Sequence, residues 1–278
     1  MSPLVIGHRG APGHLPENTL ASYRLAVRLG ADALEADLVM SRDGVLVVSH
    51  DPELSRTTDV PFRPEFARRR TRKVIDGRLM EGWFVDDFTL AELRTLNAPM
   101  PSDRIPTFDE LLLLVADESA RAGRRIGLHV EVKHPSYFAS VGLPMAGAVL
   151  ATLRDHGLDR PGHRLWLQSF DDTFLRAVSA MTQLPLVQLV DVGQRFSLHG
   201  VAAYADAIGP ARRLVLDGET TETGLVAEAH RAGLRVFVWT LRGGVEQARA
   251  FLDAGVDGIF TDDASVAVEA RAMLATIA

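Results

Sequence analysis

Charged residues stand two positions apart in two apolar stretches of this sequence. Glu35 and Asp37 lie in the stretch Ala-Leu-Glu-Ala-Asp-Leu, and Glu131 lies two positions before Lys133 in the stretch His-Val-Glu-Val-Lys. Residues two positions apart on a β-strand point to the same face, so each pair would present its charged groups together. Acids held together in an apolar setting must share protons or bind a cation.

The acids Glu35, Asp37 and Glu131 favour a hard metal ion if the fold brings them together. Like charges about 4 Å apart repel by roughly 4 kcal/mol at an effective dielectric constant of about 20, so such a group needs compensation. Oxygen ligands favour one divalent ion, Mg²⁺ or Ca²⁺, over zinc. In the alternative, the acids pair with Arg9 and Lys133 and hold no metal, which would leave three negative groups against two positive ones.

Two of the nine histidines, His8 and His50, each end an extended run beside a charged residue. A turn at residues 41–44 and the β-forming run 45–49 would bring His50 back beside Glu35 and Asp37. A pKa near neutrality suits histidine to proton transfer. We interpret the other seven as structural. His129 would pack inside the fold, and His134 would shape the loop after Lys133. The remaining five would lie in loops or helices, and these are His14, His156, His163, His199 and His230.

The elements that must position these residues follow a repeated pattern of helix, glycine and strand. Examples are residues 28–30 before the apolar run 33–37, and residues 231–233 before the run 234–238. A glycine just past a helix adopts the left-handed conformation that ends it, and strands alternating with helices indicate a parallel sheet. Eight such units predict an α/β fold, the (β/α)8 TIM barrel, rather than an open doubly wound sheet. The expected strands lie near residues 4–8, 33–39, 126–133, 164–169, 185–190, 205–216, 234–240 and 257–261.

Strand alternation in a barrel decides which side chains point inward. The apolar face of each strand meets the helices, so the acids and Lys133 should project inward near the C-terminal mouth. The same alternation sends Trp166 and Gln168 inward from one strand, and Phe237 and Trp239 inward from another.

The segment between Asp51 and Ile105 breaks this rhythm, with Pro61 and Pro64, a basic run at 68–73 and the pair Trp83-Phe84. A loop of this length in a compact domain should have its own structure, so we predict a small insertion at about 52–104 after the second barrel strand, in a single domain of residues 1–278. We interpret the basic run as a solvated charged face rather than a site for an anionic partner. The uncharged residues 135–153 indicate a polar loop leading into a buried helix, not a membrane span.

Composition narrows the classes of protein further. The chain has 278 residues, 47% of them hydrophobic and 24% charged, a net charge of −6 and no cysteine. These values exclude a disordered chain, disulfides and thiolate metal sites. The negative net charge gives no indication of a basic surface that would bind nucleic acid. No signal peptide is visible at the start, so we expect a cytoplasmic protein, or a secreted or periplasmic one if a leader was removed.

A series of short motifs resembles the glycerophosphodiester phosphodiesterases. Each motif is weak alone, but their number, order and spacing from residue 4 to about residue 265 are specific. They are His8-Arg9-Gly10, Pro16-Glu17-Asn18-Thr19, Glu35-Ala36-Asp37, Asp43-Gly44, His50-Asp51-Pro52-Glu53 continuing to Thr58, Ile105-Pro106-Thr107, Glu131-Val132-Lys133, Gln168-Ser169-Phe170, Trp239-Thr240 and Asp257-Gly258-Ile259-Phe260-Thr261-Asp262.

The resemblance implies a role for each matching residue. Glu35, Asp37 and Glu131 would be the metal ligands, and His8 and His50 the general acid and base. Arg9 and Lys133 would bind the phosphate, and Gln168 and Trp239 would line the substrate pocket.

The resemblance also implies metal-dependent hydrolysis of a small-molecule glycerophosphodiester, such as glycerophosphocholine or glycerophosphoethanolamine, to glycerol 3-phosphate and an alcohol. No nucleic acid and no stable membrane insertion are expected. One alternative is a phospholipase D-like enzyme that cleaves lysophospholipids on the same barrel. Another is a non-catalytic binding module, which the two intact histidines argue against.

Overall fold

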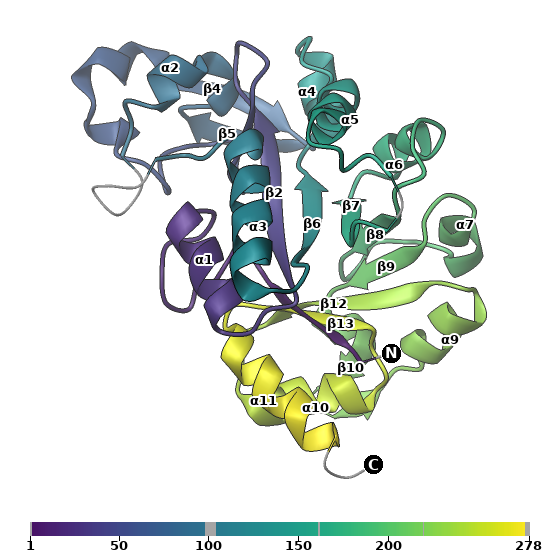
Figure 1. Cartoon of the computed structure of the whole chain (residues 1–278). Helices are drawn as coiled ribbons and strands as arrows, with labels where there is room; N and C mark the ends of the chain where they lie inside the picture. Colours follow the sequence, from purple (N-terminus) through teal and green to yellow (C-terminus); the bar gives the residue numbers. More distant parts are fainter. Residues whose placement is uncertain (1, 98–103, 161, 219, 276–278) are drawn as a thin grey trace.

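The computed structural model describes residues 2–97, 104–160, 162–218 and 220–275, and its centre is a closed barrel of eight parallel strands. Strand β1 pairs with β13 on one side and with β2 on the other, which closes the ring. The TIM barrel expected from the sequence is therefore confirmed (Figure 1). In order around the ring, the strands are β1 (Leu4–Gly7), β13 (Gly258–Thr261), β12 (Arg235–Leu241), β9 (Ala207–Pro210), β8 (Leu186–Val190), β7 (Leu165–Ser169), β6 (Gly127–Val132) and β2 (Ala33–Met40).

Helices surround the barrel, and α3 is capped at both of its ends. Helix α3 begins at a capping box of Thr107 and Glu110, and it ends at Gly123, whose φ of 61° lies in the left-handed region that glycine tolerates. The outer helices are α1 (Leu20–Arg28), α3 (Phe108–Ala122), α5 (Met145–Asp155), α6 (Asp172–Ser179), α7 (Leu198–Ala202), α9 (Leu225–Arg231), α10 (Val245–Asp253) and α11 (Ala264–Ala275).

The barrel interior is a separate apolar layer that fills the ring below the polar mouth. Trp166 and Phe237 point inward as the alternation predicted, and they pack in this inner cluster. The side chains between strands and helices form the larger core. The inner cluster consists of Ile6, Ala33, Trp166, Val187, Leu189, Ala207, Phe237 and Phe260.

Two local predictions were wrong. The strand expected at 205–216 ends at Pro210, whose missing amide hydrogen removes a donor from the ladder, and the chain continues as α8 (Arg212–Val215) and the short strand β10 (Leu216–Asp217). Strand β10 pairs with β11 (Thr221–Glu222). The polar loop expected after Lys133 begins instead as helix α4 (Pro135–Ser140), with Pro at its first position, where proline is favoured. Within the described residues, no helix is long and apolar enough to cross a membrane.

The expected insertion follows the second barrel strand. Strand β3 (Leu46–Val48) first returns antiparallel along β2, and the insertion then adds the buried residues Leu54, Phe66, Phe84 and Phe88 to the larger core. Residues 98–103 of the predicted range lie outside the described residues. The elements of the insertion are the 3-10 helices η1 (Val60–Phe62), η2 (Pro64–Arg69) and η3 (Val85–Asp87), the hairpin of β4 (Thr71–Ile75) and β5 (Arg78–Gly82), and helix α2 (Leu90–Leu93).

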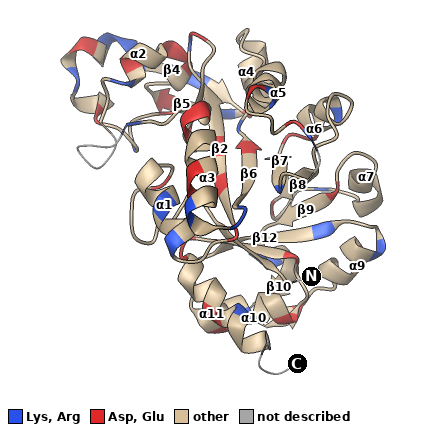
Figure 2. Cartoon of the chain, viewed as in Figure 1, with Lys and Arg blue, Asp and Glu red and all other residues tan. Residues whose placement is uncertain are grey.

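The basic run of the insertion is compensated by acids of the same segment. Arg69 pairs with Glu92, and Arg72 pairs with Glu81 across the β4–β5 hairpin. Lys73 lies between two aspartates of η3. Figure 2 shows basic and acidic residues interspersed on this part of the fold. The exposed pair of Arg72 with Glu81 fits the predicted solvated face, whereas Lys73 and Asp86 are largely buried.

Candidate active site

Strands β2 and β6 bring the three predicted acids together at the barrel mouth. Asp37 of β2 lies directly opposite Glu131 of β6 in the parallel register, and Glu35 lies one inward position below Asp37. All three side chains are buried, and one carboxylate oxygen from each lies within 4.8 Å of the others. The strand alternation therefore produced the cluster that the sequence predicted.

The two oxygens of Asp37 have different surroundings. Oδ2 accepts a hydrogen bond from Asn18 Nδ2 at 3.0 Å and lies 3.1 Å from Arg9 Nε. No hydrogen-bond donor among the described residues reaches Oδ1, which is buried, and the ammonium of Lys133 lies 3.8 Å away from it. A buried carboxylate oxygen without a donor, beside two more carboxylates, fits a hard cation such as Mg²⁺ or Ca²⁺.

Electrostatics acts in opposite directions on the pKa values of Glu35 and Asp37. Burial, followed by the negative charges of Asp37 and Glu131, raises the pKa of Glu35 well above its usual range. Burial acts in the same direction on Asp37, but Arg9 and Lys133 outweigh it and hold the pKa of Asp37 below its usual range. In the metal-free protein, Glu35 is therefore the acid that favours its neutral form.

Arg9 and Lys133 also contact the acids, as the metal-free alternative required. Lys133 Nζ lies 2.7 Å from Glu131 Oε1, and the backbone amide of Arg9 donates to Glu35 Oε2 at 3.0 Å. Burial lowers the pKa of Lys133, but Glu131 and Asp37 outweigh it and raise the pKa overall. Both cations therefore stay charged, yet Asp37 Oδ1 still receives no hydrogen bond from any residue that the structure describes.

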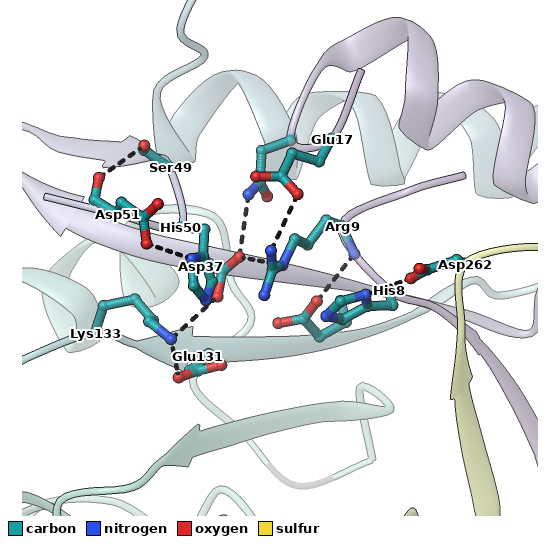
Figure 3. A network of polar contacts seen from close by, with 12 residues as sticks. His8, Arg9, Glu17, Asp37, Ser49, His50, Asp51, Glu131, Lys133 and Asp262 are labelled. Atoms are coloured by element: carbon teal, nitrogen blue, oxygen red, sulfur yellow. Dashed lines mark hydrogen bonds and ion pairs between the residues drawn. The ribbon is translucent and has the colours of Figure 1, made fainter. Parts of the chain in front are cut away.

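Each of the two predicted histidines is held by an aspartate (Figure 3). His8 Nδ1 lies 2.7 Å from Asp262 Oδ1, and His50 Nδ1 lies 2.6 Å from Asp51 Oδ1. A carboxylate at Nδ1 favours the proton there and leaves Nε2 as the acceptor. Burial lowers the pKa of His8, although Asp262 acts against this shift.

A cavity of about 670 Å³ joins these groups at the mouth of the barrel. Eight of the nine predicted site residues line it, and the ninth, Asp37, is fully buried beneath. Gln168 Nε2 lies 3.5 Å from Glu35 Oε1, and the ring of Trp239 packs edge-to-face on Phe170 with centroids 5.6 Å apart. The eight lining residues are His8, Arg9, Glu35, His50, Glu131, Lys133, Gln168 and Trp239.

Sequence reasoning missed one wall of this cavity and the partners of the histidines. The β4–β5 hairpin contributes Ile75, Leu79 and Met80 to the wall, and no motif marks them. Asp51 could have been found as the immediate neighbour of His50. Asp262 follows β13, which adjoins β1 only because the barrel closes.

The other histidines have structural surroundings. His129 is fully buried among aromatic rings, and burial lowers its pKa to about 3, which agrees with the predicted packed residue. His134 pairs with Asp76 and so ties the loop after β6 to the hairpin. Three more form hydrogen bonds with aspartates near the surface, and these are His14, His156 and His230.

Comparison with known proteins agrees with this architecture. The family model of the glycerophosphoryl diester phosphodiesterase family matches residues 8–266. A glycerophosphodiester phosphodiesterase of Arabidopsis thaliana is 31% identical over 94% of this chain and 83% of its own length. One from Haemophilus influenzae is 28% identical over 96% of this chain and 89% of its own length.

Solved structures share the fold over nearly the whole chain. A protein from Silicibacter pomeroyi superposes with a TM-score of 0.77 at 28% identity, covering 99% of this chain and 95% of its own. A phosphodiesterase from Oleispira antarctica, solved with the product sn-glycerol-3-phosphate, has a TM-score of 0.77 at 24% identity, covering 97% of this chain and 96% of its own.

The barrel and its mouth thus define a phosphoric diester hydrolase. The chain belongs to the glycerophosphoryl diester phosphodiesterase family, and it is an enzyme with glycerophosphodiester phosphodiesterase activity.

Proposed function

We propose that this enzyme converts glycerophosphodiesters, such as glycerophosphocholine or glycerophosphoethanolamine, to glycerol 3-phosphate and an alcohol with the help of one Mg²⁺ or Ca²⁺. The observation that carries the proposal is one cavity that joins Glu35 and Glu131, with Asp37 buried beside them, to two histidines that are each held by an aspartate. Family membership supports the class of substrate. Glu35, Asp37 and Glu131 are the proposed ligands of the ion.

The proposed roles of the other residues follow from their charge and position. A bound divalent ion supplies positive charge to the phosphoryl oxygens as negative charge develops on them. Arg9 and Lys133 add to that charge from the protein, since both stay protonated beside the acids. His8 and His50 transfer protons through Nε2, because Nδ1 of each faces its aspartate.

We propose the 2-hydroxyl of the substrate's own glycerol as the first nucleophile. One histidine takes the hydroxyl proton while the oxygen bonds to phosphorus, and the other protonates the departing alkoxide. Water then opens the cyclic phosphate with the two roles exchanged, which yields glycerol 3-phosphate. An intramolecular attack in favourable geometry gains about 7–11 kcal/mol over a bimolecular step.

A propane-1,3-diol phosphodiester with the same head group tests this route, because it lacks only the 2-hydroxyl. It should bind as a competitive inhibitor yet turn over more than about a hundredfold more slowly than the natural diester. Steady-state kinetics with both compounds provide the measurement. Comparable binding with a similar rate would make water the direct nucleophile.

Replacing Trp239 by alanine should raise KM more than it lowers kcat. The indole lines the cavity and packs on Phe170, so it contributes binding that is equal in the ground state and the transition state. Trp239→Phe is the matched control, because it keeps an aromatic wall and should retain most of the affinity. A fall in kcat at unchanged KM would instead move Trp239 into the catalytic set.

Product analysis tests the proposed reaction as a whole. Purified enzyme is incubated with a panel of glycerophosphodiesters and with a lysophospholipid, and glycerol 3-phosphate and free head group are both measured. We expect glycerol 3-phosphate from the water-soluble diesters. Faster cleavage of the lysophospholipid would favour the phospholipase D-like alternative, and no turnover of any substrate would favour a binding module.

A further inference from the structure

A chain of two buried hydrogen bonds supports Asp37 through residues that do not line the cavity of the acids. The hydroxyl of Tyr23, on helix α1, donates to Asn18 Oδ1 at 2.6 Å. The amide nitrogen of Asn18 in turn donates to Asp37 Oδ2 at 3.0 Å. Tyr23 and Asp37 are fully buried and Asn18 is nearly so, and neither Tyr23 nor Asn18 lines the cavity of the acids.

The direction of this chain is fixed by the chemistry of its members. Burial, followed by the negative charges of Glu35 and Asp37, raises the pKa of Tyr23 well above its usual range, so the phenol keeps its proton. An amide has one acceptor end and one donor end. A hydroxyl that donates to Oδ1 therefore turns the NH₂ group of Asn18 toward the carboxylate, and each bond polarises the next.

Asn18 is also held by its backbone. Its φ of 58° lies in the left-handed region, which asparagine tolerates better than most residues. Its backbone N–H donates a hydrogen bond to the carbonyl oxygen of Arg9 at 2.9 Å. The backbone therefore fixes where the Asn18 side chain begins, and the hydrogen bond from Tyr23 fixes the rotation of its amide group.

As a result, the two carboxylate oxygens of Asp37 have different contacts. Oδ2 is occupied by Asn18 and Arg9, whereas no donor in the described part of the chain reaches the buried Oδ1. Lys133 Nζ lies 3.8 Å from Oδ1 and 2.7 Å from Glu131 Oε1, which places Oδ1 on the side of Glu131. Because Asn18 and Arg9 hold Oδ2, Oδ1 stays available to a cation.

We propose that Tyr23 is a positioning residue of the cation site, which acts through Asn18 to hold Asp37 with Oδ1 presented to the ion. This inference rests on the proposed function of the three acids as metal ligands. Tyr23 itself touches neither substrate nor ion.

Tyr23→Phe removes only the hydroxyl and tests the inference by metal affinity. Mg²⁺ and Ca²⁺ are titrated calorimetrically into the chelator-treated full chain. We expect Kd to rise about tenfold, as is typical when an outer partner of a metal ligand is lost. Activity should return at high metal concentration, because the chain's catalytic groups remain in place.

Tyr204→Phe is the matched control. Its hydroxyl also donates to an amide oxygen, Gln188 Oε1, at 2.7 Å. The Gln188 amide nitrogen donates to backbone carbonyls, not to an acid of the site. This variant should bind both ions with unchanged Kd, although it also loses one hydrogen bond.

A double-mutant cycle separates a relayed effect from general destabilisation. Asn18→Gly removes the amide while suiting the left-handed backbone. In that background, Tyr23→Phe should change the metal Kd by less than about twofold, because residues that act as one unit are not additive. The inference is wrong if Tyr23→Phe alone leaves the metal Kd unchanged. It is also wrong if Tyr23→Phe raises Kd as much in the Asn18→Gly background as in the wild type. A wild-type chain that binds neither ion would overturn the proposed metal site itself, together with this inference.

Discussion

Replacing His50 or His8 by alanine is expected to lower kcat by about a hundredfold or more, while the affinity for divalent metal stays close to that of the wild type. Each imidazole lines the cavity, and its Nδ1 is directed to an aspartate. Neither belongs to the acid group, so removing either should affect proton transfer and not ligation. Single-turnover kinetics and calorimetric metal titration measure the two effects separately.

His230→Ala is the matched control for both variants. His230 also pairs with an aspartate, Asp257, at 2.8 Å, but it does not line the cavity. Its loss should leave kcat unchanged. Near-normal turnover by His50→Ala would remove that residue from the mechanism, and an equal loss in His230→Ala would point to a general effect of losing a histidine pair.

Metal removal should have a comparably large effect. Chelation is expected to abolish turnover, and Mg²⁺ or Ca²⁺ should restore it, because three buried acids without a cation cannot stabilise an anionic phosphoryl group. Glu35→Gln should weaken metal binding and also abolish turnover. Glu118→Gln is the control, since Glu118 is a buried acid that pairs with Arg24 outside the site. Full activity in metal-free buffer would contradict the proposed metal site.

The same Glu35→Gln variant should be no less stable than the wild type in the metal-free state. The pKa of Glu35 is raised in the folded protein, so folding favours the neutral acid. This contribution to stability is present at low pH and is lost as pH rises through the folded pKa. Glutamine is neutral throughout, so the variant's relative stability should increase with pH. Thermal melts of both metal-free proteins over a pH series measure this, and a large destabilisation of the variant at neutral pH would contradict it.

Period-two patterns made the centre of the site predictable from sequence. Asp37 and Glu131 could be assigned to one face of neighbouring strands, because alternation along a strand is a local property. The barrel followed from the repeated helix, glycine and strand pattern in the same way.

Contacts that depend on closure of the fold could not be predicted. Asp262 reaches His8 across 254 positions, only because β13 docks beside β1. The orientation of Leu79 toward the cavity depends on how the β4–β5 hairpin lies on the barrel, which the local sequence does not encode. The contact between Tyr23 and Asn18 is local, but Asn18 makes it from a left-handed backbone conformation that its motif did not reveal.

The pairing of His8 with Asp262 has a consequence for how the enzyme is made. The three acids, both histidines and Lys133 all precede residue 134, so a ribosome has synthesised them with half of the chain still to come. Asp262 follows the last barrel strand, which must insert between β12 and β1 before it can reach His8. The proton transfer proposed for His8 should therefore wait for the final strand, and the onset of activity should follow the completion of the ring rather than the synthesis of the proposed catalytic groups.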